Sequence, residues 1–256
     1  MEEYMNETIA KVQQMLSLEQ FPRASTYDIE WVSENEMGPN AMWLTEFLSE
    51  KMQFKKGMKV LDLGCGKGLS SVFLAKEFGV SVYATDLWIH ATDNFLRVKE
   101  MEVEDLVTPI HADAMKLPFA RGFFDAIVSL DAYHYFGTNE MYLEEILSYL
   151  KPQGQIGIVV PSVLQEFKDE IPERIKPYWE PYLYTHHTPE WWRKLWEHSD
   201  QLKVEVADTM PNGYENWLLW DKTLKDAGML KRGGDVEMLL ADTGNFTFCR
   251  VVGTKY

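Results

Sequence analysis

The sequence has little cysteine, no long apolar run and no basic cluster. Its 256 residues include two cysteines, Cys65 and Cys249, which lie far apart and outside any CxxC or Cys/His spacing. We therefore expect buried free thiols, and neither a disulfide nor a zinc site. No apolar run approaches the roughly 20 residues that a membrane helix needs. The first residues, MEEYMNETIAKVQQML, lack the basic and apolar regions of a signal peptide. These absences predict a cytoplasmic protein that does not enter a membrane.

Positive charge is also scarce. There are 40 acidic residues against 25 Lys and Arg, a net charge of −15. The densest basic stretches, Lys55-Lys56 and Lys231-Arg232, are too short to form the basic patch that binds nucleic acid or anionic lipid. We therefore expect no nucleic-acid or membrane partner, and a small molecule as the ligand.

Residues 59–160 alternate between short apolar runs and segments with helical periodicity. Such alternation predicts a parallel sheet with helices on both faces. In such a sheet, ligands bind beyond the carboxyl ends of the strands, here the loops at 64–68, 86–88, 113–118 and 130–136. The expected strands are 59–64, 81–86, 107–114, 124–130 and 155–161, and the expected helices are 69–78, 88–101 and 139–150.

The pattern changes after residue 161, where prolines and tryptophans become frequent. Thr188 followed by Pro189 predicts a helix start, and strands are expected at 202–210 and 245–256. The fold class is α/β, a doubly wound, mostly parallel seven-stranded sheet with a helical and aromatic cap. We expect residues 1–50 to form a helical segment that covers the ligand site and residues 51–161 to form a cofactor-binding core. Residues 162–201 would form a cap insertion, and residues 202–256 would supply strands and a helix that complete the sheet.

The glycines in VLDLGCGKG (60–68) follow an unusual spacing. A dinucleotide-binding loop places its third glycine three residues after the second, but Leu69 stands there. The third glycine comes at Gly68, after Gly64 and Gly66. Because Lys67 is followed by Gly68, the phosphate loop ending GK[ST] is absent too. The turn lets the backbone approach a ligand closely without providing a diphosphate site.

Two carboxylates follow the next strands. Asp86 ends the second strand, 20 residues after Gly66, where an acid can accept both hydroxyls of a ribose. Asp113 ends the third strand, where it can accept from an exocyclic amine. Each has a plainer interpretation, Asp86 as a strand-end cap and Asp113 as a turn former. Together with the glycine loop they favour a pocket for an adenosyl ligand without phosphates.

On these motifs the chain resembles the class I S-adenosylmethionine-dependent methyltransferases, in the small-molecule branch of types 11 and 25. The resemblance covers residues 58–160 through VLDLGCGKG, YATD, ADAMKLPF and FDAIVSLDAYHYF, in order. It implies S-adenosylmethionine as cofactor, S-adenosylhomocysteine as product, and a set of cofactor-binding residues. Asp62 would fix the glycine loop, and Gly64, Gly66 and Gly68 would bracket the methionyl part. Asp86 would hold the ribose, Leu87 or Trp88 would lie on the adenine face, and Asp113 and Ala114 would meet the adenine edge. Leu130 and Asp131 would lie near the sulfonium and the amine.

The loop after the fourth strand offers the candidate catalytic residues. The sulfonium methyl is already activated, so the protein mainly aligns the acceptor and excludes water. A base is needed only for a protonated nucleophile. Asp131, Tyr133, His134 and Tyr135 would emerge beside the methyl group, and Asp131, Tyr133 and His134 are the first candidates, with His134 as general base on its intrinsic pKa. The alternative for His134 is a pocket-lining or structural role.

No metal is expected. Members that use magnesium place an Asp-Asn pair after the fifth strand, where this chain has Pro161-Ser162-Val163. His186 and His187 are adjacent, so on an extended segment they point to opposite sides and cannot easily share a metal.

The acceptor is less constrained than the cofactor. Aromatic side chains together with carboxylates favour a cation, which suggests an amine and N-methylation. The general layout is similar to that of the glycine, sarcosine and dimethylglycine methyltransferases. More loosely, DAYHYFG (131–137) resembles a segment of the cyclopropane-synthase branch. The alternatives are a methyltransferase acting on a protein or other macromolecule, and a non-catalytic adenosyl-binding scaffold.

Overall fold

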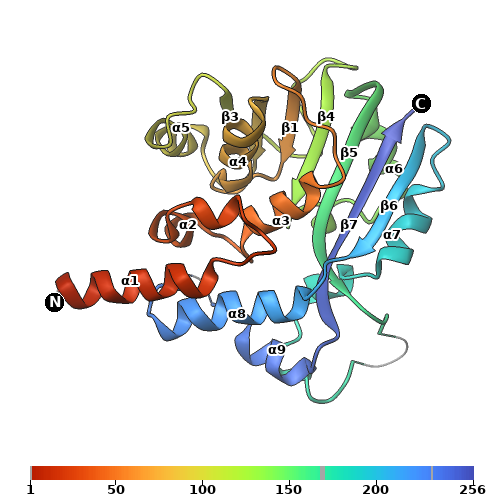
Figure 1. The fold of residues 1–256 in the computed structure, drawn as a ribbon. Coiled ribbons are helices and arrows are strands. Elements are labelled where there is room, and N and C mark those ends of the chain that lie inside the picture. The colour runs from red at the N-terminus through yellow and green to blue at the C-terminus, as the bar shows by residue number, and fades with distance from the viewer. Residues whose placement is uncertain (1, 168–170, 232) are drawn as a thin grey trace.

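A single seven-stranded sheet organises the chain in this computed structural model, which describes residues 2–167, 171–231 and 233–256. The strand order is β3-β2-β1-β4-β5-β7-β6. The pairs from β3 through β5 are parallel, whereas β7 runs antiparallel to both β5 and β6. The expected doubly wound, mostly parallel sheet is confirmed (Figure 1). The strands are β1 (Lys59–Leu63), β2 (Ser81–Asp86), β3 (Val107–His111), β4 (Phe124–Leu130), β5 (Leu150–Val163), β6 (Leu202–Thr209) and β7 (Phe246–Lys255).

Helices cover both faces of the sheet. One face packs against α3 and α4, and α8 lies against β7 on that side, while α6 and α7 pack together on the other face (Figure 1). The helices are α1 (Glu2–Leu16), α2 (Ile29–Asn35), α3 (Ala41–Ser49), α4 (Leu69–Phe78), α5 (Ala91–Glu100), α6 (Glu140–Leu147), α7 (Pro189–Trp196), α8 (Gly213–Asp226) and α9 (Val236–Asp242), with 3₁₀ turns η1 (Ala24–Thr26), η2 (Tyr133–Tyr135), η3 (Lys176–Tyr178) and η4 (Pro181–Thr185).

Two hydrophobic cores lie on opposite sides of the sheet, because neighbouring side chains of a strand point to opposite faces. In β1, Val60 joins the core under α3 and α4, whereas Leu61 joins the core under α6 and α7. In β4, Val128 and Ile127 divide in the same way. Burial on both faces explains why these strands are continuous apolar runs in the sequence.

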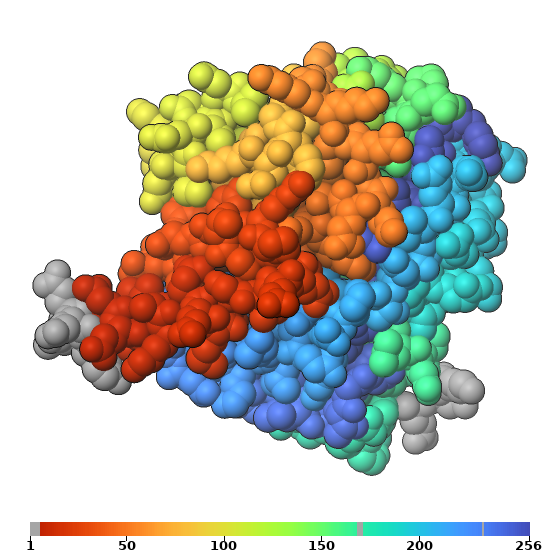
Figure 2. All heavy atoms as spheres, viewed as in Figure 1, coloured from red at the N-terminus to blue at the C-terminus, as the bar shows by residue number. Residues whose placement is uncertain are grey.

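The two ends of the chain pack together. Helix α1 contacts α8, and Figure 2 shows the N-terminal elements in red against the C-terminal helices in blue. Arg250 on β7 adds a polar connection, since its guanidinium pairs with both carboxylate oxygens of Asp208 at 3.0 and 2.7 Å. The same group lies 3.8 Å from the ring centre of Phe47 on α3.

Most expected elements are present, with shifted ends. Helix α5 begins at Ala91 and not at residue 88, because the carboxylate of Asp86 accepts hydrogen bonds from the backbone N–H groups of Trp88 and Ile89 and holds them in a turn. Strand β5 begins at Leu150, earlier than expected. The Thr188 side chain caps α7 as predicted, accepting from the N–H of Trp191.

Candidate active site

A cavity of about 330 Å³ opens at the carboxyl ends of β1, β2 and β4, in the range of small-ligand sites. We call it the main cavity. The segment between α2 and α3 forms part of its wall. Of the predicted site residues, it is lined by Gly64, Gly66, Asp86, Leu87, Trp88, Asp113, Ala114, Leu130 and Asp131. The structure thus brings nine of the expected side chains and glycines to one place.

The glycine loop lies against the loop that follows β4. A Cβ atom on Gly64 would lie 2.5 Å from the Cβ of Ala132, so only glycine allows this approach. The N–H groups of Gly64 and Cys65 both donate to the carbonyl of Thr85, at 2.9 Å. Gly68, with a φ of 86°, precedes the first turn of α4 and is outside the cavity wall.

Asp62 lies beneath the glycine loop, outside the cavity wall. It is fully buried, and its Oδ2 accepts hydrogen bonds from the hydroxyls of Ser70 and Ser71, both at 2.6 Å. Burial raises the pKa of Asp62 to about 6, although the two hydroxyls favour the ionised form. Asp62 therefore ties β1 to the start of α4 and shapes the loop from below.

Asp86 connects the glycine loop to the loop after β2. Its carboxylate accepts from the N–H groups of Gly66, Trp88 and Ile89, at 2.8, 2.7 and 2.9 Å. The side chain of Trp88 is 68% exposed at the cavity mouth, so it does not belong to the core.

Asp113 lines the main cavity from the end of β3. Its Oδ1 accepts from the N–H of Met115, at 2.9 Å. This is the turn-forming contact that the plainer interpretation of Asp113 anticipated. It leaves the side chain at the cavity wall, next to Ala114.

The loop after β4 sends three neighbouring side chains in different directions. Asp131, with a φ of 54°, faces the main cavity. Tyr133 departs from its expected catalytic place, because its ring is fully buried against Trp192 and Trp196 of α7 and lines neither cavity of the site. Tyr135, the other tyrosine expected in this loop, lines both cavities.

A second cavity of about 120 Å³ adjoins the first. We call it the histidine cavity, because His134 and His186 both line it. The two cavities have five wall residues in common: Met37, Gly38, Pro39, Asp131 and Tyr135.

His134 differs from the expected general base in its electrostatics. Burial lowers the pKa of His134 to about 3, and it lowers the pKa of His186 well below its usual value. A ring with so low a pKa is a weak proton acceptor at neutral pH. His134 therefore enters the site as a neutral hydrogen-bonding group and not as a poised base.

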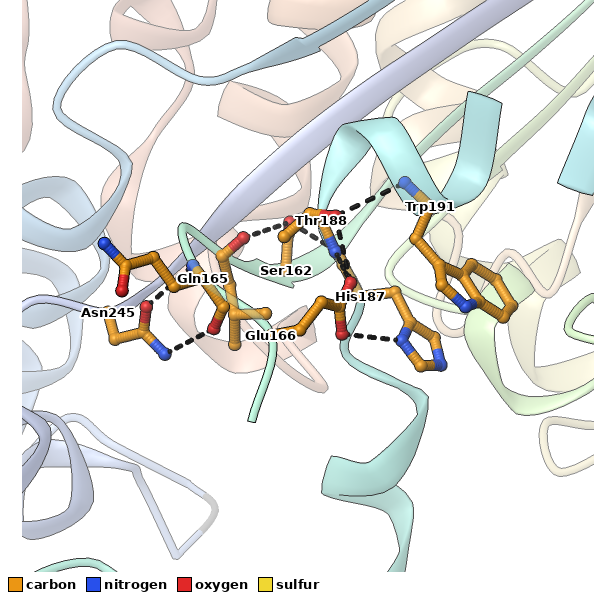
Figure 3. Close-up of polar contacts among 8 residues, drawn as sticks. Ser162, Gln165, Glu166, His187, Thr188, Trp191 and Asn245 are labelled. Atoms are coloured by element: carbon orange, nitrogen blue, oxygen red, sulfur yellow. Dashed lines mark hydrogen bonds and ion pairs between the residues drawn. The ribbon is translucent and has the colours of Figure 1, made fainter. Parts of the chain in front are cut away.

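The adjacent histidines point apart, as their spacing predicts. His187 lies outside the histidine cavity, stacked on Trp191 at 3.7 Å between ring centres and paired with Glu166 at 3.1 Å (Figure 3). Glu166 also accepts from the N–H and the hydroxyl of Thr188, at 2.8 and 2.9 Å. The Ser162 hydroxyl donates to the carbonyl of His187, at 2.7 Å. This network anchors the start of α7 to the end of β5 and sets the position of His186.

Sequence reasoning missed several wall residues. Met37, Gly38 and Pro39 come from the connection into α3, where Asn40 caps the helix by accepting from the N–H groups of Met42 and Trp43. The turn-prone Gly-Pro-Asn string could have indicated this bend. Asp235 and Met238, at the start of α9, carry no comparable signal and reach the histidine cavity through tertiary packing alone.

Among the described residues, no group of three His, Cys, Asp or Glu side chains could hold a metal ion. Within the same residues, no helix is both long and apolar enough to cross a membrane.

Comparison with known proteins places a methyltransferase domain in the chain. Residues 60–154 match the family model described as a methyltransferase domain. Methyltransferase GfsG of Streptomyces halstedii is 32% identical over 45% of this chain and 42% of its own length. A sterol 24-C-methyltransferase of Debaryomyces hansenii is 29% identical over 71% of this chain and 42% of its own. The chain thus spans less than half the length of these relatives.

The fold has matching solved structures. Phosphoethanolamine N-methyltransferase 2 of Haemonchus contortus, in complex with S-adenosyl-L-methionine, superposes with a TM-score of 0.71 at 20% identity. The match covers 95% of this chain and 60% of that one. At this identity the likeness concerns the fold.

Proposed function

From the methyltransferase-domain match over residues 60–154, we propose that the chain is a class I S-adenosylmethionine-dependent methyltransferase and that it transfers a methyl group from S-adenosylmethionine to a small-molecule acceptor. One observation carries the proposal: the main cavity joins a glycine loop and two strand-end carboxylates, Asp86 and Asp113, without a cradle for phosphates. Lys67, the single basic side chain in its described wall, donates instead to the carbonyl of Glu34.

The residues that would hold the cofactor follow from their places in the wall. Asp86 lies where it can accept from the ribose hydroxyls while its three backbone contacts fix the loop. Leu87 and Trp88 would cover the adenine, and Asp113 with Ala114 would meet its edge. Gly64 and Gly66 would contact the methionyl part, and Leu130 with Asp131 would lie near the sulfonium. Asp62 and Gly68 would act indirectly, by shaping the loop.

The chemistry asks little of the protein. The bound cofactor supplies an activated methyl group, to which the acceptor's lone pair bonds as the carbon–sulfur bond breaks and its electron pair stays on sulfur. The chain has to align the acceptor on the far side of the methyl group from sulfur and to exclude water. Tyr135 and Asp131, at the junction of the two cavities, would perform the alignment, with His134 as a neutral partner.

Residues 1–50 and 162–201 would cover the site. The first contributes Met37 and Gly38, and the second contributes Tyr182 and His186. The acidic net charge of −15 supports a small-molecule partner and not nucleic acid, and we place the activity in the cytoplasm.

Calorimetry tests the proposal. We expect the purified chain to bind S-adenosylhomocysteine and to ignore NAD and ATP. Asp86→Ala should weaken S-adenosylhomocysteine binding about 10- to 100-fold, because charge-assisted hydrogen bonds are lost. Asp105→Asn, at an exposed position outside the cavity wall, is the control and should bind normally. Uptake of NAD or ATP in place of the thioether would refute the proposal.

A further inference from the structure

The histidine cavity is placed for a second ligand. It shares Gly38, Asp131 and Tyr135 with the main cavity, so a molecule in it would lie beside the cofactor at the end of β4. Its far wall comes from Tyr182 and Leu183 of η4 and from Trp217 of α8. Segments that are distant in sequence therefore close around one small space next to the proposed methyl donor.

Two buried imidazoles in this cavity have polar atoms without partners. His134 and His186 are 1% and 3% exposed, and their ring centres lie 5.5 Å apart. Within the described chain, Nδ1 of His134 and both ring nitrogens of His186 have no hydrogen-bond partner. Buried polar atoms are rarely left unpaired. Because these nitrogens have no partner among the described residues, the two rings do not hydrogen-bond to each other, and a polar group between them could contact both.

The wall also carries charge of one sign. Asp131 and Asp235 contribute carboxylates, and no Lys or Arg is among the described wall residues. Tyr135, Tyr182 and Trp217 add aromatic surface. Such surroundings attract a cation and repel phosphate or carboxylate groups. A volume of about 120 Å³, below that of typical drug-sized ligand sites, admits a compact molecule only.

We propose that the histidine cavity is the acceptor subsite and that it selects a compact primary or secondary amine, which donates its N–H groups to the neutral imidazoles of His134 and His186. This inference rests on the proposed methyl transfer. A primary amine donates to both rings and a secondary amine donates its one N–H to either ring, and in each case the nitrogen would turn its lone pair towards the methyl group.

The proton balance follows from neutral rings. Because burial keeps both histidines unprotonated, the acceptor releases its ammonium proton to bulk water on entering and reacts as the free amine. Transfer forms the nitrogen–carbon bond, breaks the carbon–sulfur bond and leaves a positive charge on nitrogen. The carboxylates of Asp131 and Asp235 stabilise that developing charge. His134 and His186 are therefore acceptor-binding groups and not bases.

The test uses the full chain saturated with S-adenosylhomocysteine and labelled with ¹⁵N-histidine. The probes are ethylamine, ethanolamine and N-methylethanolamine, with phosphoethanolamine as the charged comparison. We expect at least one of the three amines to shift the ring signals of His134 and His186, and phosphoethanolamine to bind at least tenfold more weakly. If none of the three amines shifts these signals at 50 mM, or if phosphoethanolamine binds more tightly, the inference is wrong.

Variants separate recognition from folding. His186→Leu should weaken amine binding tenfold or more, since a buried hydrogen bond is lost, while S-adenosylhomocysteine affinity stays within twofold. His198→Gln is the control, because its side chain is 63% exposed and lines neither cavity, and it should bind the amine normally. Equal amine binding in wild type and a folded His186→Leu would overturn the assignment. Failure of the wild type to bind S-adenosylhomocysteine would instead refute the proposed function.

Discussion

Gly38 and Asp131 approach so closely that a side chain on Gly38 would overlap Oδ2 of Asp131. The two residues are 93 positions apart in sequence, yet both line the main cavity and the histidine cavity. Asp131 also has a φ of 54°, a backbone conformation that side-chain-bearing residues rarely adopt. The contact therefore joins the segment between α2 and α3 to the loop after β4, at the point where the two cavities meet.

We predict that Gly38→Ala weakens S-adenosylhomocysteine binding by about tenfold, because the added methyl group displaces Asp131 or the cover segment at a cost of about 1–3 kcal/mol. Calorimetry measures the loss. Gly233→Ala is the control, since a Cβ there meets nothing within 4 Å, and it should bind like wild type. Unchanged affinity in Gly38→Ala would mean that this contact does not hold the cavity in shape.

Stability should fall below pH 6.5. Burial depresses the folded-state pKa values of His134, to about 3, and of His186. Between the unfolded pKa near 6.5 and the folded pKa, the unfolded chain binds more protons, so acid favours unfolding. In that window, each of these histidines should lower the free energy of unfolding by about 1.4 kcal/mol for each unit that the pH falls.

Urea unfolding between pH 7.5 and 5 measures this slope. His134→Gln should make the fall in the free energy of unfolding less steep by about 1.4 kcal/mol per pH unit, the contribution of one histidine. His198→Gln, where 63% of the side chain is exposed, should leave the slope nearly unchanged. Below about pH 6 the buried Asp62 takes up a proton in the folded state and offsets part of the loss. A wild-type stability that is flat between pH 6.5 and 6 would therefore contradict neutral burial of the pair.

Arg250 should contribute strongly to folding. Its side chain is 3% exposed, pairs with Asp208, donates to the carbonyl of Phe47 and stacks on the Phe47 ring. We predict that Arg250→Met lowers the free energy of unfolding by about 2–4 kcal/mol. This loss is smaller than that for a fully buried ion pair, because water can still reach the Asp208 carboxylate. Arg193→Met, which removes a partly exposed pair with Glu197, should lower the free energy of unfolding by less than about 1 kcal/mol. Similar losses in chemical denaturation of the two variants would refute the difference.

Tyr133→Phe tests the corrected position of that residue. The hydroxyl is buried and has no hydrogen-bond partner within the described chain, so removing it should change the free energy of unfolding by less than about 1 kcal/mol. Binding of S-adenosylhomocysteine should be unaffected. A large loss of binding or of methyl transfer, with the fold intact, would return Tyr133 to the site.

Local patterns were sufficient where a strand delivers its residue directly to the sheet edge. Asp86 and the glycine loop end strands whose apolar runs are legible in the sequence, so their meeting at the main cavity could be predicted. The loop after β4 was harder. Tyr133, His134 and Tyr135 are consecutive, and a 3₁₀ turn sends the first to the core, the second to the histidine cavity and the third to the junction of both cavities. The residue types alone do not predict in which direction each of these side chains points.

By itself the sequence determined which acidic residues follow which strands. It also determined that the loop between β1 and α4 carries glycines without a phosphate motif. Those features depend on neighbouring residues and on the two-residue period of a strand. Only the tertiary structure decided that Gly38, His186 and Asp235 come together around Asp131, because contacts between distant segments depend on how the helices pack on the sheet. The same packing removed water from His134 and left its ring neutral, a change that no local pattern encodes.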